Sequence, residues 1–189
     1  MSGGEVSGNT STRTVGTCGG GVVVVSQGTF TMNGGEVHGN KSNAYGGGVF
    51  AGTNAVFIMN GGAVSGNSVT GSKEGGGVHL NNATFTMNGG VISGNDAGGG
   101  GGVFVSLSGT FNMHGGEVRG NTASKGGGVY LAGTSFTMNG GVIYGSDVGA
   151  GLANTGTSSG AAIYRAGGSV TPADLVTDVR ETTIDMRTP

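Results

Sequence analysis

Few side chains in this sequence belong to the types that do chemistry, and they are spread along the whole chain. The histidines are His38, His79 and His114, the single cysteine is Cys18, and only ten of 189 residues are acidic. Enzymes that cleave polysaccharides need clustered carboxylates, and metal sites need converging histidine, cysteine or carboxylate ligands. Whether these residues converge depends on the elements that position them.

A repeated motif, Phe-x-Met-Asn-Gly-Gly, indicates those elements. It begins at Phe30, Phe57, Phe85 and Phe136, and at Phe111 it recurs with Asn112 at the variable position and His114 in place of the Asn. Each copy follows Gly-Gly-Gly-Val, and its own Gly-Gly leads into x-Val/Ile. The units are about 25 to 28 residues long, the length of one solenoid coil. The spacing from each Phe to the next core Val or Ile is always seven residues, and nearly all length variation falls just before the glycine triplets. We predict an all-β parallel solenoid of about six coils, with three short strands per coil and one tolerant corner.

When the strands are read with a period of two, residues of the same type fall into columns along the solenoid. The predicted core contains the Phe column and two further columns: Val22, Val49, Val78, Val103, Val129 and Ile163; and Met32, Met59, Met87, Met113 and Met138. Two asparagine ladders are predicted at turns: Asn9, Asn40, Asn67, Asn95 and Asn121, continued by Asp147; and Asn33, Asn60, Asn88 and Asn139, with His114 as the exception.

This register separates the reactive side chains. Glu5 and Glu36 are neighbours in one outward column, but apolar residues separate them from Glu117, and the three histidines occupy three different columns. We therefore predict no catalytic residue, no metal site and no cofactor, and expect that the chain is not an enzyme; a polysaccharide-active enzyme is the least favoured function. The glycine runs lack the Lys-Ser/Thr of a phosphate loop, and a pI near 5.8 without a basic stripe argues against nucleic acid.

The first candidate binding surface is an aromatic row formed by the residues that follow each inward valine, flanked by a column of glycines. Its members are Phe50, His79, Phe104, Tyr130 and Tyr164. Rings beside bare backbone are expected to form a flat, exposed apolar stripe that stacks on sugar rings or packs against a partner protein. The alternative is that cross-strand aromatic pairs only stabilise the sheet.

The second candidate surface is an array of threonines on the strands that carry the Phe column. Its members are Thr29, Thr31, Thr84, Thr86, Thr110 and Thr137. Two columns of Thr with a spacing of about 4.8 Å between coils form a regular grid of hydroxyl and methyl groups. Such arrays resemble those of ice-binding β-solenoid proteins, although Val56 and Ile58 interrupt this one.

A family resemblance rests on the pairing of Phe-x-x-Asn with Gly-Gly-Ala-Val, at Phe57 to Asn60 and Gly61 to Val64. This pairing resembles the repeats of chlamydial polymorphic outer-membrane proteins and related Gly-rich bacterial surface proteins, over roughly residues 1 to 145. The resemblance implies a right-handed parallel β-helix that is exported and serves as a surface-displayed scaffold or adhesin. Most copies carry Glu or Val where the family motif has Ala.

The domain prediction is a β-solenoid over residues 1–171, starting in mid-coil, and a C-terminal cap or partner-contacting tail over residues 172–189. We expect a non-catalytic scaffold on the extracellular bacterial surface, although this chain contains no visible export signal and no membrane-inserting segment. A host protein, a glycan or a second copy joined head to tail in a filament is the expected partner. The tolerant segments 10–18, 41–45, 68–74 and 148–159 are the other expected contact surfaces.

Overall fold

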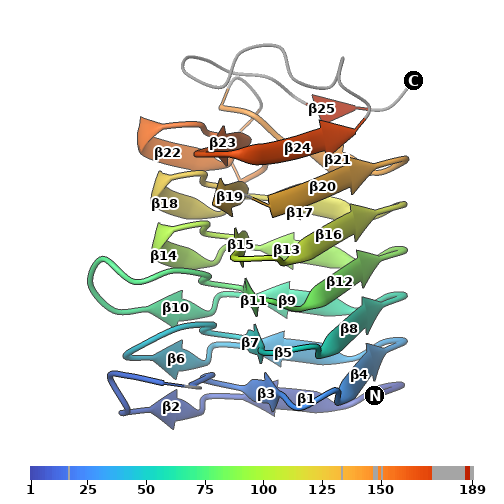
Figure 1. Cartoon of the computed structure of the whole chain (residues 1–189), viewed down its shortest axis with the longest axis vertical. Coiled ribbons are helices and arrows are strands. Elements are labelled where there is room, and N and C mark those ends of the chain that lie inside the picture. Colours follow the sequence, from blue (N-terminus) through green and yellow to red (C-terminus); the bar gives the residue numbers. More distant parts are fainter. Residues whose placement is uncertain (17, 133, 147–148, 150, 172–185, 188–189) are drawn as a thin grey trace.

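The computed structural model describes residues 1–16, 18–132, 134–146, 149, 151–171 and 186–187. The strands form a right-handed parallel β-helix of about six stacked coils (Figure 1). Most of the predicted tail, and Asp147, lie outside the described residues. No helix in the described part of the chain is long and apolar enough to cross a membrane.

Each coil contributes a strand to four sheets, rather than the three predicted. Sheet A contains β1 (Glu5–Ser7), β5 (Glu36–His38), β9 (Ala63–Ser65), β13 (Val91–Ser93), β17 (Glu117–Arg119), β21 (Val142–Ile143) and the antiparallel β25 (Met186–Arg187). Sheet B contains β2 (Thr10–Ser11), β6 (Lys41–Ser42), β10 (Ser68–Val69), β14 (Asp96–Gly99), β18 (Thr122–Lys125) and β22 (Thr155–Ser159).

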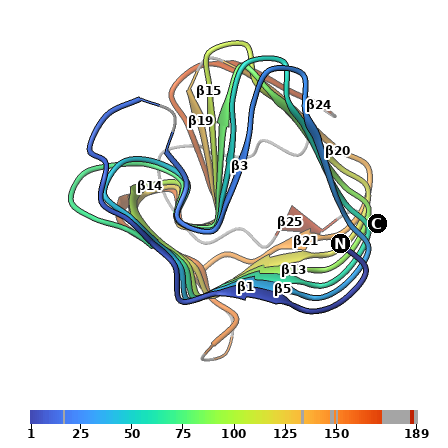
Figure 2. The same ribbon diagram turned by 90° about the horizontal axis from the view of Figure 1, so that it is seen from below.

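Sheet C contains β3 (Val22–Val24), β7 (Val49–Ala51), β11 (Val78–Asn81), β15 (Val103–Ser106), β19 (Val129–Ala132) and β23 (Ile163–Arg165). Sheet D contains β4 (Thr29–Met32), β8 (Val56–Met59), β12 (Thr84–Met87), β16 (Thr110–Met113), β20 (Thr134–Met138) and β24 (Gly168–Thr171). Figure 2, along the solenoid, shows the sheets as successive sides of the coil, with a notch between sheets B and C.

The core lies between these sheets and confirms the predicted inward columns. Phe57, Phe85, Phe111 and Phe136 are completely buried, as are the Met side chains from Met32 to Met138 in the same sheet. Adjacent Phe rings stack with centroids 4.6 to 5.3 Å apart, which is the spacing that one strand per coil imposes. Each coil therefore depends on its neighbours for burial of its own apolar side chains.

The predicted buried asparagine ladder is also present. The Nδ2 of Asn40 donates to the Oδ1 of Asn67 at 3.0 Å and to the backbone carbonyl of Val6 at 2.8 Å, and the pattern repeats in each coil. The rung above Asn121 is Asn154, which accepts from Asn121 at 2.9 Å and occupies the position predicted for Asp147. Because the ladder packs against the last glycine of each triplet, a Cβ at Gly48 would lie 2.9 Å from the Asn67 Nδ2.

Three of the predicted tolerant segments, 10–18, 41–45 and 68–74, begin as sheet B and then leave it, whereas 148–159 precedes sheet B and ends with β22. Length variation is therefore not confined to the single corner that was predicted. In the lower coils, sheet B strands have two residues, and residues 12–21, 43–48 and 70–77, here called the corner loops, connect them to sheet C. In the upper coils, the strands are longer and only three residues make the same connection. The corner loops project from the left of the molecule in Figure 1.

Candidate binding groove

The aromatic row follows the predicted register in sheet C. Phe50 pairs with His79, His79 with Phe104, Phe104 with Tyr130 and Tyr130 with Tyr164. Ring centroids of successive members lie 4.7 to 5.4 Å apart, so the rings form one stack along the solenoid.

The expectation that this row is an exposed stripe is wrong. Phe50 and His79 are each 3% exposed and Phe104 is 7% exposed, and only Tyr130 and Tyr164 are half-buried. The rings also cover one another's faces, with Phe50, His79 and Phe104 within 14° of parallel. A sugar ring therefore cannot stack on the faces in the middle of the row, because aromatic neighbours already occupy them. The flanking glycines are likewise covered, by the asparagine ladder.

The burial of the row follows from the glycine triplets. The first glycine of most triplets has a positive φ, as at Gly100 with φ of 58°, and this turns the chain sharply from sheet B into sheet C. A Cβ on Gly100 would lie 2.5 Å from the Val103 carbonyl oxygen and 2.8 Å from the Phe104 Cβ. The absence of side chains here lets the backbone pack against the row, whose buried rings fill the inward bend of the chain between sheets B and C in Figure 2. We use the name corner groove for this bend together with the corner loops beside it.

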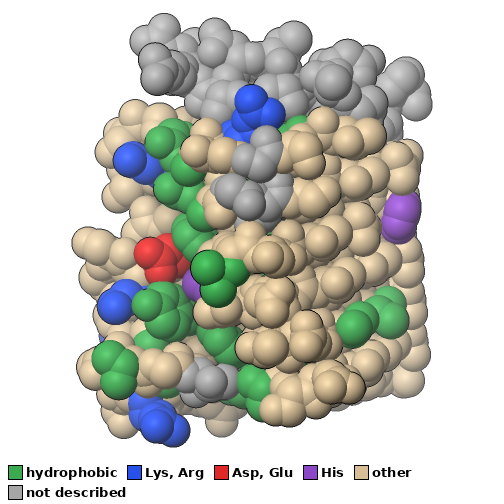
Figure 3. Space-filling model, in the orientation of Figure 1, with side chains coloured by type: hydrophobic (Ala, Val, Ile, Leu, Met, Phe, Trp, Pro, Cys, Tyr) green, Lys and Arg blue, Asp and Glu red, His purple; other side chains and the backbone are tan. Residues whose placement is uncertain are grey.

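Charged and aromatic groups of the corner loops and sheet B line the outer side of the corner groove. The Tyr45 ring contacts the His79 ring with centroids 4.8 Å apart, and the Lys73 Nζ lies 5.2 Å from the Tyr45 centroid. The Lys125 Nζ lies 5.3 Å from the Tyr164 centroid. Figure 3 shows hydrophobic side chains in an upright band on this side, with Lys and Arg along its outer edge. Two pairs of cation and ring therefore flank the groove.

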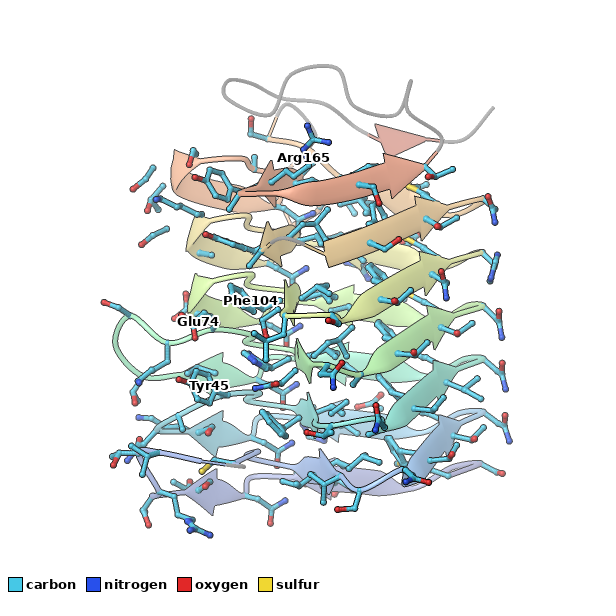
Figure 4. The ribbon with its side chains drawn as sticks, in the orientation of Figure 1. Tyr45, Glu74, Phe104 and Arg165 are labelled. Carbon is cyan, nitrogen blue, oxygen red and sulfur yellow. The ribbon has the colours of Figure 1, made fainter. Side chains whose placement is uncertain are left out.

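Burial shifts the pKa of two groups in the groove, His79 and Glu74. It lowers the pKa of His79 to about 4, against the opposing effect of the hydrogen bond between Nδ1 and the Glu74 carbonyl oxygen at 3.3 Å. It raises the pKa of the Glu74 carboxyl, and the nearby Lys73 acts in the opposite direction. Figure 4 places Tyr45, Glu74 and Phe104 above one another along this side. His79 is therefore neutral at physiological pH and serves as an aromatic ring.

The groove opens into a hollow of about 410 Å³ at its lower end. Its polar lining groups are the uncharged side chains of Ser26, Tyr45, Thr53 and Asn81. The remaining lining is apolar: Gly16, Val25, Phe50 and Gly52. This volume falls within the range of about 300 to 1,000 Å³ typical of small-molecule sites. The hollow can therefore hold a small uncharged ligand with hydrogen-bonding groups.

The turn between β15 and β16, above the hollow, has an unfavourable backbone conformation. Leu107, in the turn between β15 and β16, has a φ of 54° and is 63% exposed. In the neighbouring coils, Asn54 and Asn82 adopt the same left-handed conformation, which asparagine tolerates better than a branched apolar residue. Leu107 thus combines backbone strain with an exposed apolar surface.

The threonine array lies on the outer face of sheet D in the predicted register. Thr84 pairs with Thr110 and Val56, and Thr86 pairs with Asn112 and Ile58. Thr29 is exposed, and Thr31, Thr84, Thr86, Thr110 and Thr137 are half-buried. The columns are regular in the backbone, but Val56, Ile58 and Asn112 divide the hydroxyl grid.

Sequence reasoning missed a polar cluster on sheet A. The His38 Nε2 lies 3.1 Å from a Glu5 carboxylate oxygen and 3.9 Å from one of Glu36, because Glu5 and Glu36 pair across adjacent coils and His38 lies two residues along. The hydrogen bond to His38 lowers the pKa of Glu5. Comparing the two outward columns of the strand together could have revealed this cluster.

The remaining reactive groups stay apart. The Glu117 carboxylate pairs with the Arg119 guanidinium at 3.1 Å. Cys18 is buried, and its Sγ donates to the Val15 carbonyl oxygen at 3.1 Å. Within the described ranges, no three His, Cys, Asp or Glu side chains are arranged to hold a metal ion. Comparison with protein-family models, with curated proteins and with solved structures found no match to this chain.

Proposed function

We propose that this chain is a non-catalytic scaffold of the extracellular bacterial surface, of the adhesin kind, that holds its ligand in the corner groove. The observation that carries the proposal is the aromatic row, which runs unbroken from β7 to β23 beneath loops of different lengths. A rigid stack fixes the floor of the groove, while the loops supply chemical variety at its wall. The likeness of the repeats to those of surface-displayed proteins supports the location.

The ligand that suits the hollow best is a neutral glycan. Hydroxyl and amide groups of Ser26, Thr53 and Asn81 can exchange hydrogen bonds with sugar hydroxyls, and Val25 and the Phe50 edge can cover the apolar side of a sugar ring. A uronic acid finds no cation in the lining of the hollow. This mode of binding uses ring edges and polar groups, since the middle ring faces are occupied.

Intrinsic fluorescence provides the test, because the chain has no tryptophan and three of its four tyrosines, Tyr45, Tyr130 and Tyr164, border the groove. Titration with neutral oligosaccharides, N-acetylated ones among them, should change the tyrosine emission, and titration with uronic-acid oligosaccharides should not. Asn81→Ala should weaken binding about five- to tenfold, through loss of a hydrogen bond worth roughly 1 kcal/mol. Thr86→Ala on sheet D, the matched control, should leave binding unchanged. No response to any oligosaccharide would remove the glycan proposal, and a response that persists in Asn81→Ala would move the site elsewhere.

Ice binding by sheet D is the second candidate function, and the registered Thr columns favour it. Thermal hysteresis measured on the intact chain tests it directly. Activity that Thr86→Tyr abolishes would support it, because a ring at this position disrupts the grid. Absence of hysteresis in the unmodified chain would exclude this function.

Head-to-tail association and the lack of enzymatic activity remain predictions. Negative-stain electron microscopy across a dilution series separates fibres from isolated rods, and incubation with polysaccharides separates a binder from an enzyme by the release of new sugar ends.

A further inference from the structure

A column of Asn-Gly pairs lies at the turn between sheets D and A. Asn33, Asn60, Asn88 and Asn139 are each exposed and each followed by glycine. His114 occupies the remaining position of the column, before Gly115. Asn-Gly is the pair in which the backbone nitrogen most readily attacks the preceding carboxamide, because glycine has no side chain to obstruct the approach.

We propose that this column is a site of spontaneous modification in the folded protein, in which Asn33 and Asn139 react first and Asn60 reacts last. The glycine nitrogen forms a bond to the asparagine Cγ, and the bond from Cγ to Nδ2 breaks with release of ammonia. One water molecule then opens the cyclic imide at either carbonyl, giving aspartate or isoaspartate. The reaction consumes only water and involves no oxidant or reductant.

The order of reaction follows first from the hydrogen bonds of the carboxamides. The Asn60 Nδ2 donates to the Asn33 Oδ1 at 2.7 Å, and the Asn60 Oδ1 accepts from the Asn88 Nδ2 at 2.7 Å. Asn60 is thus held at both ends and cannot turn its Cγ toward the glycine nitrogen without losing both bonds. Asn139 has only a 3.4 Å contact from Nδ2 to the His114 Nδ1, and the Nδ2 of Asn33 donates to no described residue.

The glycine amide nitrogens that attack the carboxamides also differ in their hydrogen bonds, in the same order. The Gly61 amide donates to the Met32 carbonyl oxygen at 3.4 Å, and the Gly89 amide donates to that of Met59 at 3.3 Å. The amides of Gly34 and Gly140 make no hydrogen bond to the described part of the chain. Attack requires this nitrogen to lose its proton and move toward Cγ. Asn139 therefore combines a free nucleophile with the least restrained carboxamide, and Asn33 combines a free nucleophile with a carboxamide that is held by one hydrogen bond, against two at Asn60.

Modification would change both the charge and the register of this turn. Each event replaces a neutral amide by a carboxylate, so four events would take the formal net charge from −2 to −6. Isoaspartate also lengthens the backbone by one methylene. The turn joins strands of fixed register, such as Phe57 paired with Phe85 and Val64 paired with Ile92, so the extra length must be absorbed at the exposed surface.

Peptide mapping by mass spectrometry during incubation of the purified chain in warm, mildly alkaline buffer tests the proposal. Asn33 and Asn139 should convert about fivefold or more faster than Asn60, since one hydrogen bond of roughly 1 kcal/mol changes a rate by about that factor. In denaturant, where the column is lost, the four sites should convert at similar rates. Equal rates in the folded chain, or conversion of Asn60 first, would overturn the proposal, as would complete protection of all four sites.

Two variants test the structural cause. His114→Asn should slow conversion of Asn139, because the new side chain can accept from Nδ2 in the manner of Asn33 with Asn60. Gly34→Ala should slow conversion of Asn33 alone, since its Cβ meets nothing closer than the Ser2 carbonyl oxygen at 3.0 Å and obstructs only the local attack. Circular dichroism confirms that each variant is folded. An unchanged rate at Asn139 in His114→Asn would contradict the role of the ladder.

Discussion

The imidazole ring of His79 lies nearly parallel to the phenyl ring of Phe104, with centroids 5.1 Å apart and planes 14° from each other. A similar arrangement holds on its other face with Phe50, at 5.4 Å and 12°. A titratable ring is thus sandwiched between two apolar rings. Protonation of that ring would place a charge in an environment that cannot solvate it.

Stability is therefore predicted to fall as the pH is lowered from about 6.5 to about 4. In this range the unfolded chain takes up a proton on His79 while the folded chain does not, since burial holds the folded pKa at about 4. The expected loss is roughly 3 kcal/mol. Urea unfolding across this range measures it.

The control for this prediction is His79→Phe, which continues the row with the ring type of its neighbours. This variant should remain folded, and its free energy of unfolding should lose most of its dependence on pH between about 6.5 and about 4. Glu74 contributes with the opposite sign, because its raised pKa stabilises the folded state as the pH falls. An unchanged slope in His79→Phe would show that another group causes the loss.

Asn67→Ala is expected to destabilise the protein by roughly 2 to 5 kcal/mol. The change leaves the buried Val37 carbonyl and the Asn40 backbone amide without their partners, which lie 2.9 and 3.0 Å away in the intact ladder. Asn60→Ala removes the same side chain from the exposed column and should cost less than about 1 kcal/mol. Chemical denaturation of the two variants provides the comparison. An equal loss of stability in the two variants would mean that burial does not determine how much an asparagine of the ladder stabilises the fold.

Gly47→Ala is expected to be strongly destabilising even though its φ is ordinary. Its Cβ would lie 2.5 Å from the Gly76 carbonyl oxygen and 2.6 Å from that of Ser68, and backbone atoms of adjacent coils cannot move aside separately. A cost of at least about 1 to 3 kcal/mol is expected from such overpacking. Gly3→Ala is the control, because its Cβ meets nothing within 4 Å. Thermal unfolding should distinguish them, and similar midpoints would argue against close packing between coils.

Leu107→Asn is expected to stabilise the protein by about 1 kcal/mol, through relief of the left-handed strain. The reciprocal change Asn82→Leu should destabilise it by a similar amount, since Asn82 has a φ of 54° as well. Unfolding midpoints of both variants provide the test. If Leu107→Asn lowers stability, the leucine side chain must make contacts that outweigh its backbone strain.

Spacing along the chain was enough to predict the fold and most of its columns. A constant seven residues from Phe to Val or Ile requires both residues to face the same interior, so the amino-acid sequence alone assigns Phe85 and Ile92 to the core. The rung at Asn154 could not be predicted in this way. The insertion before it removes the constant spacing on which the reasoning depended.

Sheet B and the burial of the aromatic row were missed for a related reason. Residues such as Lys41, Ser68 and Asp96 share a register but no chemical type, so hydrogen bonds between coils define these strands without a side-chain pattern. The outward direction of His79 was correctly predicted from the period of two. The segment that covers His79 could not be predicted. The pattern of a strand contains no information about a preceding loop that folds back over it at Gly75.

The buried asparagine ladder gives the solenoid a dipole along its axis. From Asn9 to Asn121, each Nδ2 donates to the Oδ1 of the next rung toward the C-terminal end, so the amide dipoles add rather than cancel. Such a chain of hydrogen bonds polarises its own members. The positive ends of the dipoles point toward Asn154, whose Nδ2 donates to the carbonyl oxygens of Val118 and Tyr144. The rod is thus polar along its axis without a single ionised side chain in the ladder.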